Sequence, residues 1–105
     1  MGPRRRRVTW TERAIAAVDE ALVHIAAESP ANAERVLTRI LDAAASLSEL
    51  SERGRIVPEF GEPHLRELII PPFRLVYRND ETSVSILTLL HSAREFRLRR
   101  SDLDR

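Results

Sequence analysis

The fold is decided by one stretch, HLRELIIPPFRLVYRNDETSVSILTLLHSAR, which runs from His64 to Arg94. It contains three runs with strand-like composition, namely Leu65–Ile70, Phe73–Arg78 and Ser83–Leu90. Pro71-Pro72 separates the first two runs, because consecutive prolines cannot donate the hydrogen bonds of a sheet. Asn79–Thr82 separates the last two, and Asn and Asp favour turn geometry. The stretch therefore predicts an antiparallel meander of three strands.

The residues before the meander predict one short strand and two helices. Arg7–Thr11 is β-prone and alternating, and its last residue suits the N-cap of a helix that extends to about Glu28. Ser29-Pro30 suits the start of a second helix, which extends to about Arg53 and ends at Gly54. The predicted apolar stripes are Ile15, Val18, Leu22 and Ile25 in the first helix and Val36, Leu37, Ile40, Leu41, Ala44, Leu47 and Leu50 in the second.

Each helix has one apolar face, so both must pack on the meander to be stable. The expected fold class is α+β with the order β-α-α-β-β-β, a helical hairpin packed on one face of a small antiparallel sheet. We expect one domain over residues 1–105, with residues 1–6 as a poorly ordered start and residues 95–105 as a charged tail. The loop Gly54–Pro63 has room for a brief extended segment. Nothing else in the chain is expected to cover the opposite face of the sheet.

Alternation along the meander assigns side chains to the two faces. In its second run the aromatic residues share one face, which we assign to the core. Arg74 and Arg78 then lie on the open face. His91 is in phase with Leu87 and Leu89, and the face that these three occupy depends on the strand register.

Composition excludes several kinds of chemistry. The chain has no cysteine, so disulfides, thiolate metal sites and cysteine nucleophiles are excluded. The three histidines have no metal-ligand spacing and the three glycines form no phosphate-binding loop, so we expect no metal and no cofactor. No apolar run approaches the roughly 18 residues of a membrane span, and no hydrophobic segment follows the N-terminal arginines. We therefore expect a cytoplasmic protein without membrane contact.

Basic charge is concentrated at the two ends of the chain. All 17 basic residues are arginine, and the formal net charge is only +1. The clusters are Arg4–Arg7 at one end and Arg94, Arg97, Arg99 and Arg100 at the other. Such clusters either bind phosphate without regard to sequence or are solvated tails, and composition alone does not decide between these alternatives.

Acid–base chemistry has one candidate set. Glu59, Arg74 and His91, with Glu67 as a fourth member, are the groups that a compact sheet face could gather. A carboxylate base, a histidine acid and an arginine phosphate clamp would suffice for cleavage of RNA. The alternative is structural, with a histidine at a strand end and an arginine on a solvated face.

The open face also predicts a protein partner. A bare sheet with Ile69, Ile70 and Leu89 near its edges would invite aggregation. A groove that is apolar and rimmed by arginines suits an acidic amphipathic helix or an added strand from another chain.

Several segments together resemble the RelE/ParE toxin family of bacterial type II toxin–antitoxin modules. The resemblance covers roughly residues 7 to 96. It is carried by Gly54-Arg55, Val57-Pro58-Glu59, Leu65-Arg66-Glu67-Leu68, Phe73-Arg74-Leu75-Val76-Tyr77-Arg78 and Leu89-Leu90-His91. It implies a toxin held inactive by a cognate, acidic antitoxin that wraps the open sheet face, and contact with promoter DNA only through that antitoxin.

The family includes two mechanisms. RelE-like members cut mRNA in the ribosomal A site, and that resemblance implies Arg74 as clamp, His91 as acid and Glu59 as base. ParE-like members inhibit DNA gyrase by binding, and that resemblance implies partner or target contacts at Arg66, Arg78, Arg94 and Arg97.

The sequence favours the ParE-like side. Ser92 stands where a RelE-like nuclease would offer an aromatic acid, lysine is absent, and Tyr77 is the single tyrosine and is assigned to the core. A module member that binds its antitoxin but has no remaining target is a third alternative.

Overall fold

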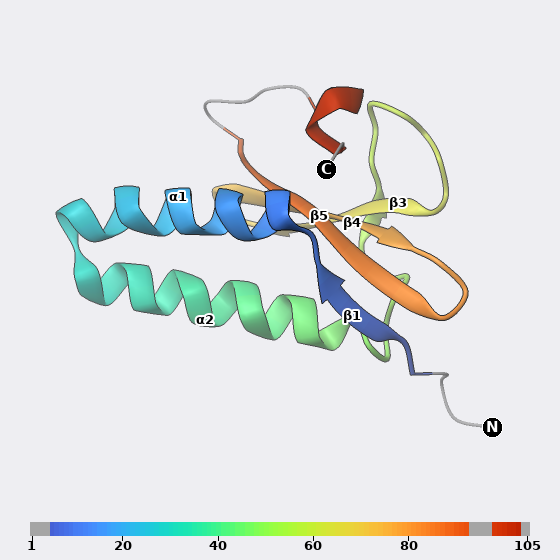
Figure 1. The fold of residues 1–105 in the computed structure, drawn as a ribbon, viewed down its shortest axis with the longest axis horizontal. Coiled ribbons are helices and arrows are strands. Elements are labelled where there is room, and N and C mark those ends of the chain that lie inside the picture. Colours follow the sequence, from blue (N-terminus) through green and yellow to red (C-terminus); the bar gives the residue numbers. More distant parts are fainter. Residues whose placement is uncertain (1–4, 93–97, 104–105) are drawn as a thin grey trace.

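The computed structural model of the chain describes residues 5–92 and 98–103, and Figure 1 shows how their helices and strands are arranged. The elements are β1 (Arg7–Trp10), α1 (Glu12–Glu28), α2 (Pro30–Ser46), β2 (Arg55–Ile56), β3 (Leu65–Ile70), β4 (Phe73–Asn79), β5 (Ser83–His91) and a 3-10 turn, η1 (Arg100–Leu103). The predicted α+β fold of two helices packed on a sheet is confirmed. Two helices of 17 residues each form the hairpin.

The five strands lie in the order β1-β5-β4-β3-β2. The predicted meander of β3, β4 and β5 is antiparallel, as expected, and the brief extended segment in the loop is β2, antiparallel to β3. One feature differs from the prediction. β1 pairs with β5 in parallel, so the sheet is mixed. The helical hairpin between β1 and the meander carries the chain back across the sheet, which permits a parallel neighbour.

The predicted helix starts are present. The Thr11 hydroxyl accepts a hydrogen bond from the Ala14 N–H at 3.1 Å, and the Ser29 hydroxyl accepts one from the Asn32 N–H at 3.1 Å. Pro30 follows in the first helical turn, where its missing N–H costs nothing.

The second helix ends earlier than predicted, at Ser46 rather than near Arg53. The Ser46 hydroxyl donates to the Ala43 carbonyl at 2.6 Å and accepts from Arg53 at 2.8 Å, which gives the backbone an alternative to further helix. The Ser48 carbonyl accepts the Arg6 N–H at 2.7 Å instead of an N–H of the helix. Gly54 therefore lies in the connection to β2 and not at a helix end.

The main core lies between the helices and the sheet, and its buried residues are Ala14, Val18, Val36, Ile40, Ala44, Leu47, Leu68, Ile70, Phe73, Leu75, Tyr77, Val84, Ile86 and Leu89. Three members of the predicted stripes lie outside it. Ile15, Leu41 and Leu50 are about half exposed, at 49%, 49% and 58%. Ala14 is fully buried instead, because a small residue lets α1 approach the sheet closely.

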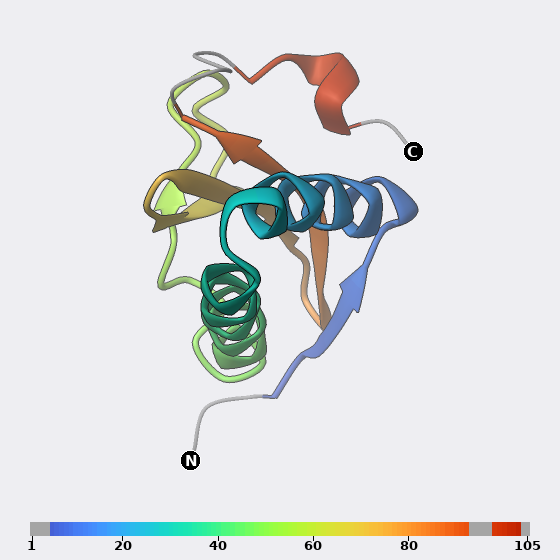
Figure 2. The ribbon, with the colours of Figure 1, turned by 90° about the vertical axis from the view of Figure 1, so that its left-hand side faces the viewer.

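The expectation of an uncovered opposite face is wrong for part of that face. A second apolar cluster buries it, formed by Val57, Leu65, Val76, Leu87, Leu90 and Leu98, with Phe60 and Leu103 packed against it. Its cover comes from the loop after β2 and from the segment 98–103. Figure 2 shows β5 between α1 and η1, so η1 and the first helix of the hairpin lie on opposite sides of this strand.

The N-terminal arginines have defined contacts where the structure describes them. Arg5 pairs with Glu49 at 2.9 Å, and the Arg6 Nε donates to the Asp80 carbonyl at 2.8 Å. Residues 1–4 of the expected disordered start, and residues 95–97 and 104–105 of the expected tail, lie outside the described residues.

Candidate functional site

A buried ion cluster lies on the second face of the sheet, where Arg74 is held between two carboxylates. Its Nη1 and Nη2 donate to the two oxygens of Glu59 at 2.9 and 2.8 Å, and its Nε donates to Glu67 at 2.6 Å. The second oxygen of Glu67 accepts from Arg55 at 2.5 Å. Arg74 was predicted to lie on an open face, but only 8% of its side chain is exposed.

Three elements bring this cluster together. Arg74 is on β4 and Glu67 is its diagonal neighbour on β3, because Ile69 is paired with Arg74 in the ladder. Glu59 comes from the loop after β2. One of its oxygens also accepts the Leu98 N–H at 2.7 Å, so the same carboxylate fastens the C-terminal segment over the sheet. The second apolar cluster explains the burial, since its covering segments exclude water from Arg74.

Within this cluster, Arg74 and Glu59 shift each other's pKa. The two-pronged hydrogen bond from Arg74 lowers the pKa of Glu59 from 4.5 to about 2, although burial opposes this effect. The hydrogen bond to Glu59, and to a smaller extent the one to Glu67, raises the pKa of Arg74 above its usual range, although burial opposes this effect. Arg74 and Glu67 are buried and the side chain of Glu59 is 12% exposed, whereas that of Arg55 is 58% exposed. Together the two arginines balance the charge of the two carboxylates.

His91 lies on the other face of the sheet. It is paired across the ladder with Phe73, and the two rings meet edge to face with centroids 5.4 Å apart. The next residue pair along the strands is Leu90 with Arg74, whose side chains lie on the opposite face. The predicted set of Glu59, Arg74 and His91 is therefore not assembled, since only Glu59 and Arg74 meet.

A β-bulge decides the face of His91. The ladder register shifts between Val76 and Tyr77, so that β5 has one extra residue, Leu87. Leu87 lies in the second apolar cluster and Leu89 in the main core, so the predicted common phase of Leu87 and His91 is wrong. An extra residue moves every later side chain to the other face.

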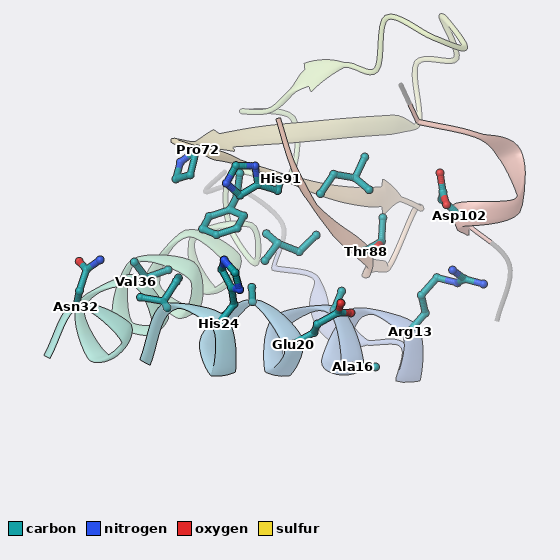
Figure 3. A pocket seen from close by; sticks show the side chains of 16 residues that line it. Arg13, Ala16, Glu20, His24, Asn32, Val36, Pro72, Thr88, His91 and Asp102 are labelled. Atoms are coloured by element: carbon teal, nitrogen blue, oxygen red, sulfur yellow. The ribbon is translucent and has the colours of Figure 1, made fainter. Parts of the chain in front are cut away.

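His91 lines a groove of about 470 Å³ between α1 and the end of β5. Figure 3 shows His24 and Glu20 of α1 facing Pro72 and His91 across it, with Asp102 of η1 near one end. His24 was predicted to be a solvated or rim residue, and it is exposed at the margin of the groove, but the groove itself was not predicted. The sequence does contain a signal for a groove. On the face of α1 that carries Glu20 and His24, the neighbouring positions are alanines, and their small side chains leave room above the helix.

The groove contains both polar and apolar groups. Its apolar lining includes Ile25, Val36, Phe73 and Leu89, which belong to or pack against the main core. This composition is typical of a site for another protein segment, with an apolar floor and polar groups at the margin.

The four predicted contact arginines have different surroundings. Arg66 is committed to structure, because it donates to the carbonyls of Pro63 and Gly54, both at 2.9 Å. Arg78 is half-buried on the second face near the β4–β5 turn. Arg94 and Arg97 lie outside the described residues.

Tyr77 is buried in the main core, as predicted. Its hydroxyl donates to the Ser51 carbonyl at 2.7 Å and accepts the Gly54 N–H at 3.0 Å. Burial raises the pKa of this phenol. Tyr77 is therefore a structural group between the core and the loop before β2.

Two negative findings concern the described residues alone. Within residues 5–92 and 98–103, no group of three or more His, Cys, Asp or Glu side chains could hold a metal ion. In the same part of the chain, no helix has the length and apolar character needed to cross a membrane.

The model of a known family matches residues 8–96, and the family is the ParE toxin of the type II toxin–antitoxin system parDE. The chain belongs to the ParE toxin family. The match extends from β1 to beyond β5, so it includes the ion cluster and every residue that lines the groove except Asp102.

The proteins that this ParE-family chain resembles in sequence or in fold carry the names RelE and ParE. Toxin RelE2 of Caulobacter vibrioides is 37% identical over 89 residues, which are 84% of this chain and 97% of that protein. The chromosomal ParDE system of P. aeruginosa superposes with a TM-score of 0.69 at 22% identity, covering 82% of this chain and 95% of the other. The RelBE2 complex of Mycobacterium tuberculosis gives 0.60 at 23% identity, covering 84% and 92%. The two structures agree with this chain in fold.

Proposed function

We propose that this ParE-family toxin acts by binding and inhibiting DNA gyrase and that it does not cleave RNA. The observation that carries the proposal is the state of Arg74. Three of its five N–H donors, one on each nitrogen, are bound by carboxylates, and the side chain is 8% exposed, so little of the guanidinium is accessible. An arginine that stabilises a phosphoryl transition state must present free donors to it. Two carboxylates beside the guanidinium would also repel a phosphate.

The other groups of the nuclease hypothesis support the same conclusion. His91 is separated from Arg74 by the sheet, so the two cannot touch one scissile phosphate in this arrangement. Glu59 has a pKa of about 2, which makes it a weak base near neutral pH. Tyr77 is buried and engaged at its hydroxyl. A toxin without an assembled acid and base is better suited to acting as a binding protein.

The proposed physiological partner is a cognate antitoxin. Two solved relatives of similar fold are described as a ParDE system and a RelBE2 toxin–antitoxin complex, which supports such a partner for this chain. The groove between α1 and β5 is the concave, partly apolar site that an antitoxin segment would fill. Promoter DNA would then be contacted through the antitoxin.

A RelE-like nuclease is the second candidate, because Toxin RelE2 is 37% identical. The substitution His91→Gln separates the two candidates, with His24→Gln as the matched control from the opposite wall of the groove. Both variants would be induced without antitoxin in a host that can be rescued by supplying it. We expect both to arrest growth as the parent does. Arrest lost in His91→Gln alone, with unchanged thermal stability, would favour the nuclease.

A further inference from the structure

The second face of the sheet is divided into two parts of opposite character. The part near η1 is apolar and covered by the second cluster. The part near the β4–β5 turn is polar and is either exposed or half-buried. We call this second part the arginine–hydroxyl patch, and it consists of Arg7, Thr9, Arg78, Ser83 and Ser85.

Strand register makes the patch continuous. Arg7 lies beside Ser83 and Thr9 beside Ser85 across the β1–β5 pair, and Arg78 lies beside Ser85 across the β4–β5 pair. Neighbouring strands are about 4.8 Å apart, so side chains from three strands form one surface. The two arginines lie on either side of β5, with its two serines between them.

The charge of the patch is not neutralised within the described chain. Among the described residues, Arg5, Arg55, Arg74 and Arg100 are in ion pairs with glutamates, whereas no ion pair involves Arg7 or Arg78. Arg6 adds a third guanidinium near this end of the sheet, because its Nε donates to the Asp80 carbonyl. The carboxylates of Asp80 and Glu81 lie at the exposed hairpin tip, beyond the patch.

We propose that the arginine–hydroxyl patch contacts the phosphate backbone of duplex DNA. Arginine and serine are among the side chains that contact phosphate oxygens in DNA complexes. The patch contains no aromatic residue, so it lacks the stacking platform that single-stranded nucleic acid requires. It also contains no large apolar side chain, which a protein partner would need as an anchor.

The inference rests on the proposed function in one respect, since gyrase acts on DNA and a toxin bound to it would lie near duplex. Contact with phosphate alone carries no sequence information, so binding is weak, independent of sequence and salt-dependent. The groove lies between α1 and the last residues of β5, and none of its lining residues belongs to the patch, which leaves the patch accessible when an antitoxin segment fills the groove.

Fluorescence anisotropy of the purified toxin with a labelled random duplex of about 20 base pairs tests the proposal. Arg7→Ala and Arg78→Ala are the test variants. Arg35→Ala and Arg39→Ala, at exposed positions on α2, are controls with the same change in charge. Each test variant should weaken binding on the order of tenfold at about 50 mM salt and lower the slope of log affinity against log salt by about one. Ser83→Asp, which removes no arginine, should weaken binding as well.

Three results would overturn the proposal: equal effects of the patch and α2 variants, preference for a single strand of the same sequence, or preference for a polyglutamate peptide. Thermal melts of each variant identify effects caused by unfolding, and Ser83→Asp then provides the independent test. The assay contains no gyrase. A supercoiling assay with the same variants therefore judges the proposed function separately, because gyrase inhibition without DNA binding would refute the patch alone.

Discussion

At the scale of single residues, Glu59 should make stability depend on acidity. Its pKa is lowered from 4.5 to about 2 in the folded chain, mainly by Arg74. A carboxyl group with a depressed folded pKa stabilises fully above its unfolded pKa and loses this contribution as pH falls toward the folded value. The shift corresponds to about 3 kcal/mol at neutral pH. Urea unfolding should therefore show a steep loss of stability between pH 4.5 and pH 2.

The variant Glu59→Gln assigns this loss to one group. It should be less stable than the parent at pH 6 by several kcal/mol, and the gap should narrow as the pH approaches 2. Glu49→Gln, which affects an exposed pair with Arg5, should cost less than about 1 kcal/mol at any pH. A gap that does not change with pH would contradict the coupling of Glu59 to Arg74.

Gly54 is constrained by close packing. A Cβ at this position would meet the Tyr77 hydroxyl at 2.6 Å and the Glu67 carbonyl oxygen at 2.7 Å. Gly54→Ala should therefore destabilise by about 1–3 kcal/mol, measured by thermal unfolding. Gly61→Ala is the comparison, because Gly61 has open space but a φ of +65°, and its cost should be only about 1 kcal/mol. Equal stability of Gly54→Ala and the parent would show that the loop yields without penalty.

The residue-scale predictions from sequence failed where they depended on distant segments. Alternation placed Arg74 on the face opposite the core, but its burial depends on Glu59 and on a segment that reaches Leu98. The face of His91 depends on a bulge at Leu87, which no local pattern reveals. Tyr77 was predicted to be buried because it shares a strand face with other large apolar residues, and this is confirmed.

At the scale of elements, the segment from Leu98 to Leu103 acts as the cover of the second apolar cluster. Leu98 is 3% exposed and its N–H is bound by Glu59. Leu98→Ala should cost about 2–4 kcal/mol, seen as a lower melting temperature. Leu50→Ala, at a position that is 58% exposed, should remain within about 0.5 kcal/mol of the parent. Similar melting temperatures for the two variants would mean that the segment does not cover the sheet in solution.

Elements with local signals were predictable from sequence. Capping residues and apolar spacing located the starts of both helices, and the prolines and the Asn79–Thr82 turn located the strands of the meander. The end of α2 was not predictable, because it depends on hydrogen bonds from Arg6 and Arg53 to Ser48 and Ser46. The covering segment was missed because its charged composition hides two leucines that pack inward.

At the scale of the whole molecule, three features occupy different parts of the sheet. The groove lies between α1 and the last residues of β5, the ion cluster is buried on the second side, and the arginine–hydroxyl patch is accessible on that second side near the β4–β5 turn. This separation agrees with the proposal that the toxin binds its antitoxin and its target through different surfaces. It also disfavours catalysis, since the candidate acid and the candidate clamp lie on different sides of the sheet.

The most direct test of the proposed gyrase inhibition is made after the toxin has been induced without antitoxin. Messenger RNA 5′ ends and plasmid supercoiling would be measured in the same culture, with rescue by antitoxin as the control. If the toxin inhibits gyrase, plasmid supercoiling should be lost or gyrase-linked DNA breaks should appear, and no new mRNA ends should form. New ends at ribosomal A sites, together with undamaged and normally supercoiled DNA, would contradict gyrase inhibition and restore His91 and Arg74 as candidate catalytic residues. Normal growth would contradict it as well, and would indicate a module member without a target.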